Sequence, residues 1–159
     1  MRQIIRRREI VADELRYAGE PELDGTIVVQ PLAQWIASAG SADAPAAVLL
    51  GATDEVEALA PYLQSVRWIV IEFAKLGEGR GFSQARMLRQ RYGYTHELRA
   101  RGVLKRDQLF LLARCGFDAF DLDPAEDLAA SLPALNTFSV AYQNGSDALV
   151  SVRQRALAV

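Results

Sequence analysis

The chain of 159 residues has one cysteine and one histidine, and these low counts exclude several kinds of site. Cys115 alone cannot form a disulfide within the chain or a multi-cysteine metal centre, and His96 alone excludes a zinc site with several histidines. No apolar run approaches the roughly 20 residues of a membrane-spanning helix. The basic start of the chain also lacks the unbroken apolar stretch of a secretory signal. These absences predict a cytoplasmic protein with no metal site and no membrane segment.

The residues that are present fit one folded domain. Half of them are hydrophobic and 24% are charged, which is the usual balance of a globular protein. A chain of this length can bury a single core without support from a metal or a disulfide. No stretch rich in proline, glycine or serine divides it, so we expect one domain over residues 1–159.

Charge is unevenly distributed along the chain, although the net charge is only −2. Residues 75–115 contain ten basic and three acidic side chains, a net charge of +7, and the remainder carries −9. Such a field attracts an anion or an acidic partner, whereas the plainer interpretation is a solvated, arginine-rich surface on two helices. The acidic overall balance and the lack of a recognised binding motif predict that the partner is not a nucleic acid.

Strands and helices are expected to alternate. Apolar or β-branched runs begin near residues 26, 47, 68, 95 and 117, about 20 to 28 residues apart, which is the length of a strand–helix unit. The run WIVIEF at 68–73 has the continuous apolar character of a parallel strand covered on both faces. The pattern predicts an α/β domain with a mainly parallel sheet in a flavodoxin-like, doubly wound arrangement. The alternative is a truncated, barrel-like array of such units, because a complete barrel needs about 250 residues.

Helix boundaries are expected at a few residues. Pro31 opens a helix that Gly40 ends, and Asp54 forms a capping box with Glu57. Ser83 is predicted to cap a helix over 84–91. We also expect a helix over 104–115, a strand over 117–122 and a last strand at 138–142.

Candidate site residues lie where the predicted parallel strands end, since ligands of such sheets bind there. The loop GEGRGFS joins glycines, an arginine and a helix start, a combination suited to a phosphate, sulfate, sulfite or carboxylate. The predicted anion-binding residues are Gly79, Arg80, Gly81, Ser83, Arg99 and Gln108. Glu72 and Asp107 are the candidate catalytic carboxylates. The plainer alternatives are a capped turn, salt bridges and, for Asp107, a favourable position at a helix start.

Two isolated side chains are assigned structural roles. His96 has no partner carboxylate identified by the sequence, so a satisfied surface histidine is the expectation. Cys115 lies on the apolar stripe of a predicted helix, which indicates a buried thiol rather than a nucleophile.

The stretch over residues 71–120 resembles the bacterial family known as domain of unknown function 934. The matching motifs are GRGFS at 79–83, AR and LR at 85–89, ELRA at 97–100, DQL at 107–109 and GFDAF at 116–120. They cover about a third of the chain. His96 stands where the family usually has glycine, and Val103 stands where an acidic residue is usual.

The resemblance implies a place in assimilatory sulfite reduction, because members are commonly encoded beside sulfite reductase and are often labelled probable oxidoreductases. The sequence has no haem-attachment pair, iron–sulfur cysteine set or dinucleotide fingerprint. The cofactor therefore stays unknown, with a flavin left open because it binds without a sequence fingerprint.

Two functions follow. The first is an accessory protein that binds sulfite reductase, its electron donor or a sulfur oxyanion through a basic face, with Arg86, Arg89 and Arg101 as partner contacts. The second is a small enzyme acting on an anionic sulfur compound, in which Arg80, Ser83 and Arg99 hold the anion and Glu72 or Asp107 transfers a proton. Whether the chain is catalytic is left open by the sequence.

Overall fold

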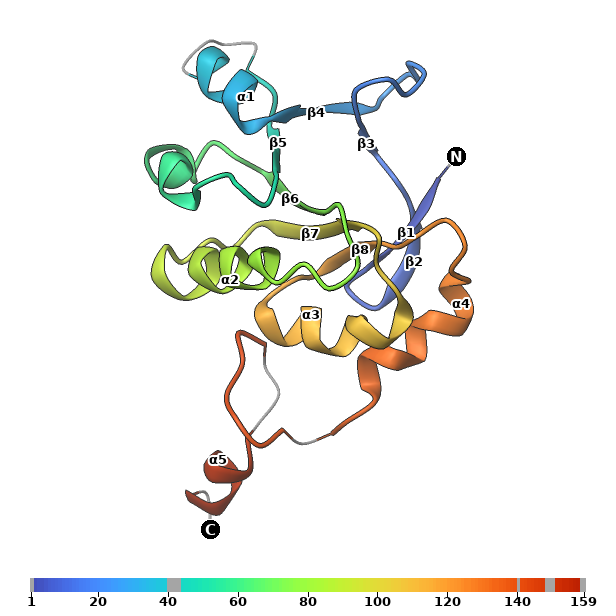
Figure 1. The fold of residues 1–159 in the computed structure, drawn as a ribbon, viewed down its shortest axis with the longest axis vertical. Helices are drawn as coiled ribbons and strands as arrows, with labels where there is room; N and C mark the ends of the chain where they lie inside the picture. The colour runs from blue at the N-terminus through green and yellow to red at the C-terminus, as the bar shows by residue number, and fades with distance from the viewer. Residues whose placement is uncertain (1, 40–43, 140, 148–150, 158–159) are drawn as a thin grey trace.

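A computed structural model describes residues 2–39, 44–139, 141–147 and 151–157. Eight strands among these residues form a curled sheet in the order β2-β1-β8-β7-β6-β5-β4-β3 (Figure 1). The strands are β1 Gln3–Arg6, β2 Glu9–Ala12, β3 Leu15–Arg16, β4 Ile27–Pro31, β5 Ala47–Leu50, β6 Trp68–Phe73, β7 Glu97–Gly102 and β8 Ala119–Asp121. The α-helices are α1 Leu32–Ser38, α2 Arg80–Arg86, α3 Leu109–Cys115, α4 Leu128–Ser131 and α5 Val152–Leu157. The 3-10 helices are η1 Val56–Tyr62, η3 Arg106–Gln108 and η4 Leu132–Asn136, and η2 Met87–Arg91 is a π-helical segment.

Most of the sheet is parallel. Strands β3 to β8 pair in parallel in chain order, and β1 pairs antiparallel with β2 and β8. The register places Glu72 opposite Arg101, and Arg101 opposite Asp121. This confirms the predicted α/β class and the mainly parallel sheet.

The helices cover one face of the sheet. Trp35 of α1, Leu59 of η1, Leu88 of η2 and Leu112 of α3 belong to one core cluster with side chains of β5 to β8. A doubly wound sheet reverses its strand order and carries helices on both faces. The flavodoxin-like wrapping is therefore not confirmed, and the sequential strand order is that of the barrel-like alternative.

The second face of the sheet is crossed by the chain itself. Residues 13–17 lead from the edge strand β2 to the opposite edge strand β3, and Leu15 and Tyr17 pack there with Val29, Trp68 and Val70. The Asp13 N–H donates to the Arg2 carbonyl at 2.8 Å, which joins this crossing to the start of β1. The segment consequently buries charged side chains that the sheet presents on this face.

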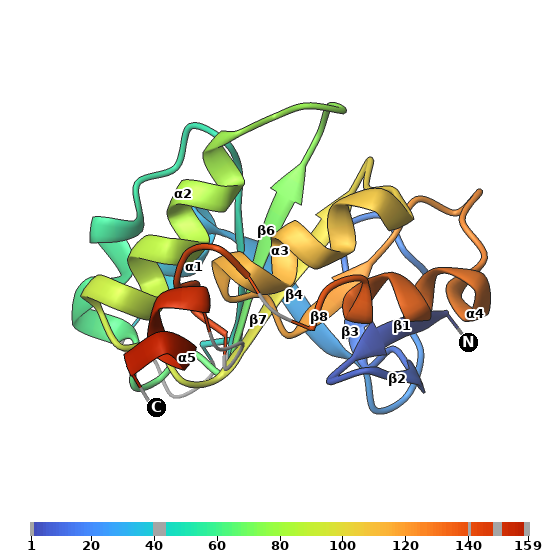
Figure 2. The ribbon, with the colours of Figure 1, turned by 90° about the horizontal axis from the view of Figure 1, so that it is seen from below.

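The amino-terminal residues form a hairpin, whereas no strand was predicted before residue 26. Its two-residue turn is Arg7-Arg8, and both residues have positive φ, 48° and 70°. Asparagine and glycine are the usual signals for such a turn, so the arginine pair concealed it. The hairpin and α4 lie at the end of the molecule opposite α1 and α2 (Figure 2).

Several predicted boundaries are wrong. The cap of η1 is Glu55 without a side-chain hydrogen bond, because the Asp54 carboxylate accepts the Gly51 N–H at 2.7 Å instead. Gly40, the predicted end of the first helix, and Val140, within the predicted last strand, lie outside the described residues. The segment predicted as a last strand has only an isolated bridge, Ala141 to Ser151, in its described part.

The carboxyl-terminal segment ends in α5, which projects away from α3 (Figure 1). Trp35, Trp68 and Cys115 are buried as predicted, and burial raises the pKa of the Cys115 thiol. No described helix combines the length and the apolar character needed to cross a bilayer.

Candidate functional site

The predicted anion-binding loop contains the first residues of helix α2, and Ser83 does not cap that helix. Helix α2 begins at Arg80, with Gly79 as its N-cap residue at φ −90°, and no side chain caps it. Ser83 therefore lies inside the helix and is exposed, so its predicted capping role is wrong. Gly81 lets the helix approach the sheet closely: a Cβ atom there would lie 2.5 Å from the Phe73 ring.

Arg80 and Ser83 line a groove of about 600 Å³ between α2 and η1. The Arg80 Nε donates to the Ala52 carbonyl at 3.2 Å. The same groove is lined by Asp54, Glu55 and Glu57, and these carboxylates oppose the entry of an anion.

Asp107 and Gln108 lie on η3, at the same edge of the sheet. The Gln108 side-chain oxygen accepts the Lys105 N–H at 3.0 Å and so caps the start of η3. Asp107 is exposed in the first turn. This geometry is the one expected of a stabilised helix start.

Arg99 lies on the opposite face of the sheet from α2. It is fully buried, with Nη1 2.6 Å from an Asp13 oxygen and Nη2 2.8 Å from a Glu97 oxygen. A second donor, Nε, reaches the same Glu97 oxygen at 3.0 Å. The structure thus separates Arg99 from Arg80 and Ser83, with which it was expected to hold one anion.

A second part of this charged cluster lies beside Arg99. Arg101 stacks on the Tyr17 ring, with its guanidinium carbon 3.4 Å from the ring centroid. Its Nε lies 3.3 Å from an Asp121 oxygen, and Arg2 contacts Glu20 at 2.6 Å. Glu72 is half-buried opposite Arg101 in the register, so the structure brings Glu72, Arg99 and Arg101 to one face.

Electrostatics in this cluster follow from burial and pairing. Burial opposes ionisation of Asp13, but the charge of Arg99 and hydrogen bonds hold the pKa of that carboxyl below its ordinary value. Burial raises the pKa of Asp121 despite Arg2 and Arg101. Burial also raises the pKa of Tyr17 to about 12. The arginines of the cluster are matched by carboxylates, so it is a structural network rather than a vacant anion site.

The amino-terminal members of this network were missed by the sequence analysis. Arg2 precedes β1, Asp13 and Tyr17 belong to the crossing segment, and Glu20 follows it. All four are far in sequence from Arg99 and Arg101. The β-branched pairs Ile4-Ile5 and Ile10-Val11 were the available signal for strands in this segment. This signal would have indicated the strands, but not the side chains that they meet across the sheet.

Arg86 and Arg89 of the predicted partner surface have different surroundings. Arg86 is exposed on α2. Arg89 donates to the carbonyls of Gly116, Tyr94 and His96 at 2.6 to 2.8 Å and lies 3.4 Å from Asp118. Arg89 therefore joins η2 to the segments before β7 and β8, and it supports the fold.

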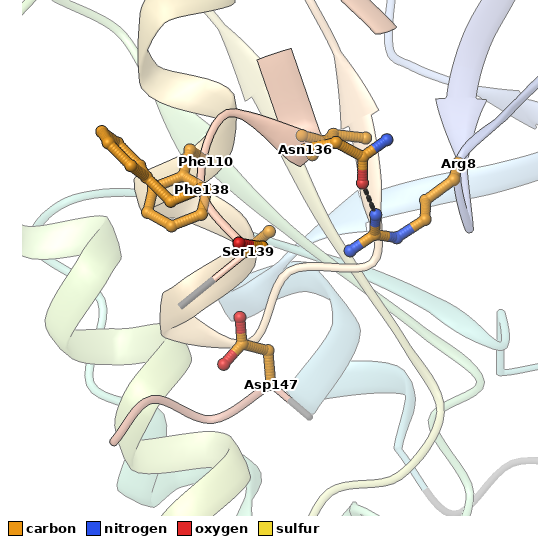
Figure 3. Close-up of a pocket in the computed structure, with 8 residues that line it drawn as sticks. Arg8, Phe110, Asn136, Phe138, Ser139 and Asp147 are labelled. Carbon is orange, nitrogen blue, oxygen red and sulfur yellow. Dashed lines mark hydrogen bonds between the residues drawn. The ribbon is translucent and has the colours of Figure 1, made fainter. Parts of the chain in front are cut away.

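A separate hollow of about 330 Å³ lies beside α3 (Figure 3). The rings of Phe110 and Phe138 pack edge to face on one side, with centroids 5.0 Å apart. On the other side Arg8 donates to the Asn136 side chain, as Figure 3 shows. Asp147 lies 2.5 Å from Arg114. The two charged groups that line this hollow, Arg8 and Asp147, therefore each have a partner in the fold.

Within the described residues, no group of three or more histidine, cysteine, aspartate or glutamate side chains is arranged to hold a metal ion. A comparison with curated proteins finds no match. A family model matches residues 47–152, from β5 to the start of α5, which is more than half of the chain. The chain therefore belongs to the family described as bacterial protein of unknown function, DUF934.

Proposed function

We propose that the chain is an accessory protein that binds an acidic surface of a partner protein through exposed arginines on α2 and η2. The supporting observation is a division among the basic side chains of residues 75–115. Arg89, Arg99, Arg101 and Arg114 are directed into ion pairs and carbonyl contacts of the fold. The exposed remainder is Lys75, Arg80, Arg86, Arg91, Lys105 and Arg106.

The exposed cations lie on neighbouring elements. Arg80 and Arg86 are on α2, and Arg91 follows on η2. Arg91 lies 3.8 Å from Glu57, whereas Arg86 forms no salt bridge with a described residue. Exposed arginines of this kind attract an acidic surface at long range, and salt weakens the attraction.

Sulfite reductase or its electron donor is the first partner to test, because the family resemblance associates members with that enzyme. The small-enzyme alternative receives no support from the geometry, since Arg99 lies across the sheet from Arg80. A partner among cytoplasmic enzymes also agrees with the expected location of the chain.

The test is titration of the purified chain into sulfite reductase of the same organism, by calorimetry at low and moderate salt. The variant Arg80→Glu/Arg86→Glu should bind at least about tenfold more weakly, a loss of about 1.4 kcal/mol. The matched control is Arg7→Glu/Arg67→Glu, which makes the same charge change at other exposed arginines. Arg89 is left unchanged because its loss would disturb the fold.

Wild-type affinity should fall with salt, and the control should bind within about twofold of the wild type. No binding at either salt would remove sulfite reductase as the partner. Equal losses in both variants would show a general charge effect and would contradict a specific α2 surface.

A further inference from the structure

A polar hollow of about 260 Å³ lies at the edge of the sheet where β6 and β7 begin. Four parts of the chain meet there: the turn of the first hairpin, Glu14 after β2, the residues entering β6 and the residues entering β7. Arg7, Arg67, Thr95 and His96 contribute donor groups to its lining. The hollow is remote from Arg80, which follows the opposite end of β6.

The two carboxylates that line this hollow already form ion pairs with arginines of the fold. Glu14 lies 2.6 Å from Arg6, and Glu97 pairs with both Arg6 and Arg99. The Arg6 Nε is 3.0 Å from its Glu97 oxygen at an angle unsuited to a hydrogen bond, so that contact is an ion pair only. Arg6, Glu14 and Glu97 therefore form an ion-paired wall whose own net charge is −1.

Arg7 and Arg67 add positive charge to that wall. Both are exposed, and neither forms a salt bridge within the part of the chain that the structure describes. The Arg67 guanidinium carbon lies 5.0 Å from the centroid of the Trp68 ring, which also lines the hollow. Asp118 interacts with Arg7 electrostatically, but its carboxylate accepts the Leu98 N–H at 2.7 Å and faces Arg89.

The backbone at the turn supports a role for these arginines. Arg7 and Arg8 both adopt positive φ, which arginine disfavours and which asparagine or glycine would adopt readily. In this conformation Arg7 lines the polar hollow while Arg8 lines the separate hollow beside α3. The strained turn thus presents a guanidinium at each of two sites.

We propose that the polar hollow binds a small multivalent oxyanion of the phosphate and sulfate type. The forks of Arg7 and Arg67 each offer paired N–H donors to such an anion, and Thr95 and His96 offer further donors. The volume accommodates a small inorganic anion and its bound water. This proposal does not depend on the binding of a partner protein through α2.

The test is calorimetric titration with sodium phosphate and sodium sulfate, with sodium chloride keeping the ionic strength constant. The wild type should show saturable binding with a Kd in the millimolar range or below and a rise in melting temperature. The variant Arg7→Glu/Arg67→Glu should lose at least about tenfold in affinity. The variant Arg80→Glu/Arg86→Glu is the matched control and should bind within about twofold of the wild type.

If the double variant is not folded, Arg67→Gln and His96→Ala are to be titrated singly, and each should weaken binding. An absence of saturable binding to both anions by the wild type would overturn the proposal. Equal loss in the control variant would also overturn it, because it would reveal attraction to the whole surface. The control variant separates this result from failure of the α2 partner surface.

Discussion

Arg99 illustrates how one residue can be essential to the fold without being available to a ligand. Its guanidinium is fully buried and contacts Asp13 and Glu97 from two sides. Burying such charges carries a desolvation penalty, which favourable pairing offsets only while every member is present. Loss of one member leaves a buried charge without its partner, so neutral substitutions in this network should be strongly destabilising.

Asp13→Asn should therefore lower the free energy of unfolding by about 3 kcal/mol at pH 7. The folded-state pKa of Asp13 lies below its ordinary value, so its ionised form stabilises the protein at higher pH. That contribution should be constant between about pH 8 and 5. It should shrink as the pH falls below about 4, through the folded-state pKa. Urea unfolding of wild type and variant at several pH values measures the difference.

The control for Asp13→Asn is Glu22→Gln, which neutralises a carboxylate in an exposed pair with Arg16 at 3.2 Å. The Glu22 side chain is 83% exposed, so the loss in the free energy of unfolding should be below about 1 kcal/mol. A loss for Asp13→Asn as small as that of the control would contradict the structural role given to the buried network.

Gly81 and Gly79 provide a second comparison at single residues. A Cβ atom at Gly81 would lie 2.5 to 3.0 Å from atoms of Phe73 and Ile71, whereas none lies within 4 Å at Gly79. Gly81→Ala should lower the free energy of unfolding by about 1–3 kcal/mol through overpacking. Gly79→Ala should change it by less than about 1 kcal/mol, because the lower entropy of the unfolded chain offsets the poorer N-cap residue. Chemical denaturation measures both, and equal effects would contradict the close approach of α2 to the sheet.

Among the helices, α2 has a start that differs clearly from the predicted one. It begins four residues before the predicted range, and a π-helical segment continues it to Arg91. Ser83 is consequently an exposed helix residue and not a cap. A true side-chain cap occurs in α4, where the Asp127 carboxylate accepts the N–H groups of Ala129 and Ala130 at 2.8 and 3.2 Å.

This difference predicts opposite results for two substitutions. Ser83→Ala should leave stability unchanged or raise it by up to about 0.5 kcal/mol, because alanine has the higher helix propensity. Asp127→Ala should lower the free energy of unfolding by about 1 kcal/mol through loss of the cap. Thermal and urea unfolding of both variants provide the measurement. If Ser83→Ala were the more damaging change, the assigned start of α2 would be wrong.

Other elements followed closely from the sequence pattern. The continuous apolar runs predicted β5 and β6 with their observed bounds, since such runs are buried on both faces of a parallel sheet. Strand β7 begins two residues later than the predicted start near residue 95. Tyr94 instead packs in the core beside Arg89, which accounts for the apolar character before that strand. The first hairpin was missed because its turn consists of arginines.

Across the whole molecule, the curled sheet divides the basic residues into a buried set and an exposed set. The crossing of residues 13–17 brings Asp13 to Arg99, and Glu20 just after it reaches Arg101, whereas α2 leaves Arg80 and Arg86 exposed on the other side. The polar hollow with Arg7 and Arg67 lies at the opposite strand ends from Arg80. The two double variants described above therefore alter two separate surfaces by the same charge.

By itself the sequence determined the α/β class, the order of the main strands and helices, the buried positions of Trp35, Trp68 and Cys115, and the family. These features depend on local periodicity and on motifs that are contiguous in the chain. Only the tertiary structure decided which arginines are available to a ligand or partner. The carboxylates that pair with the buried arginines can be distant in the sequence, as Asp13 is from Arg99. The tertiary structure also decided the strand order at the sheet edges and the side of the sheet on which each charged residue lies. Those properties depend on how distant segments pair, which local periodicity does not encode.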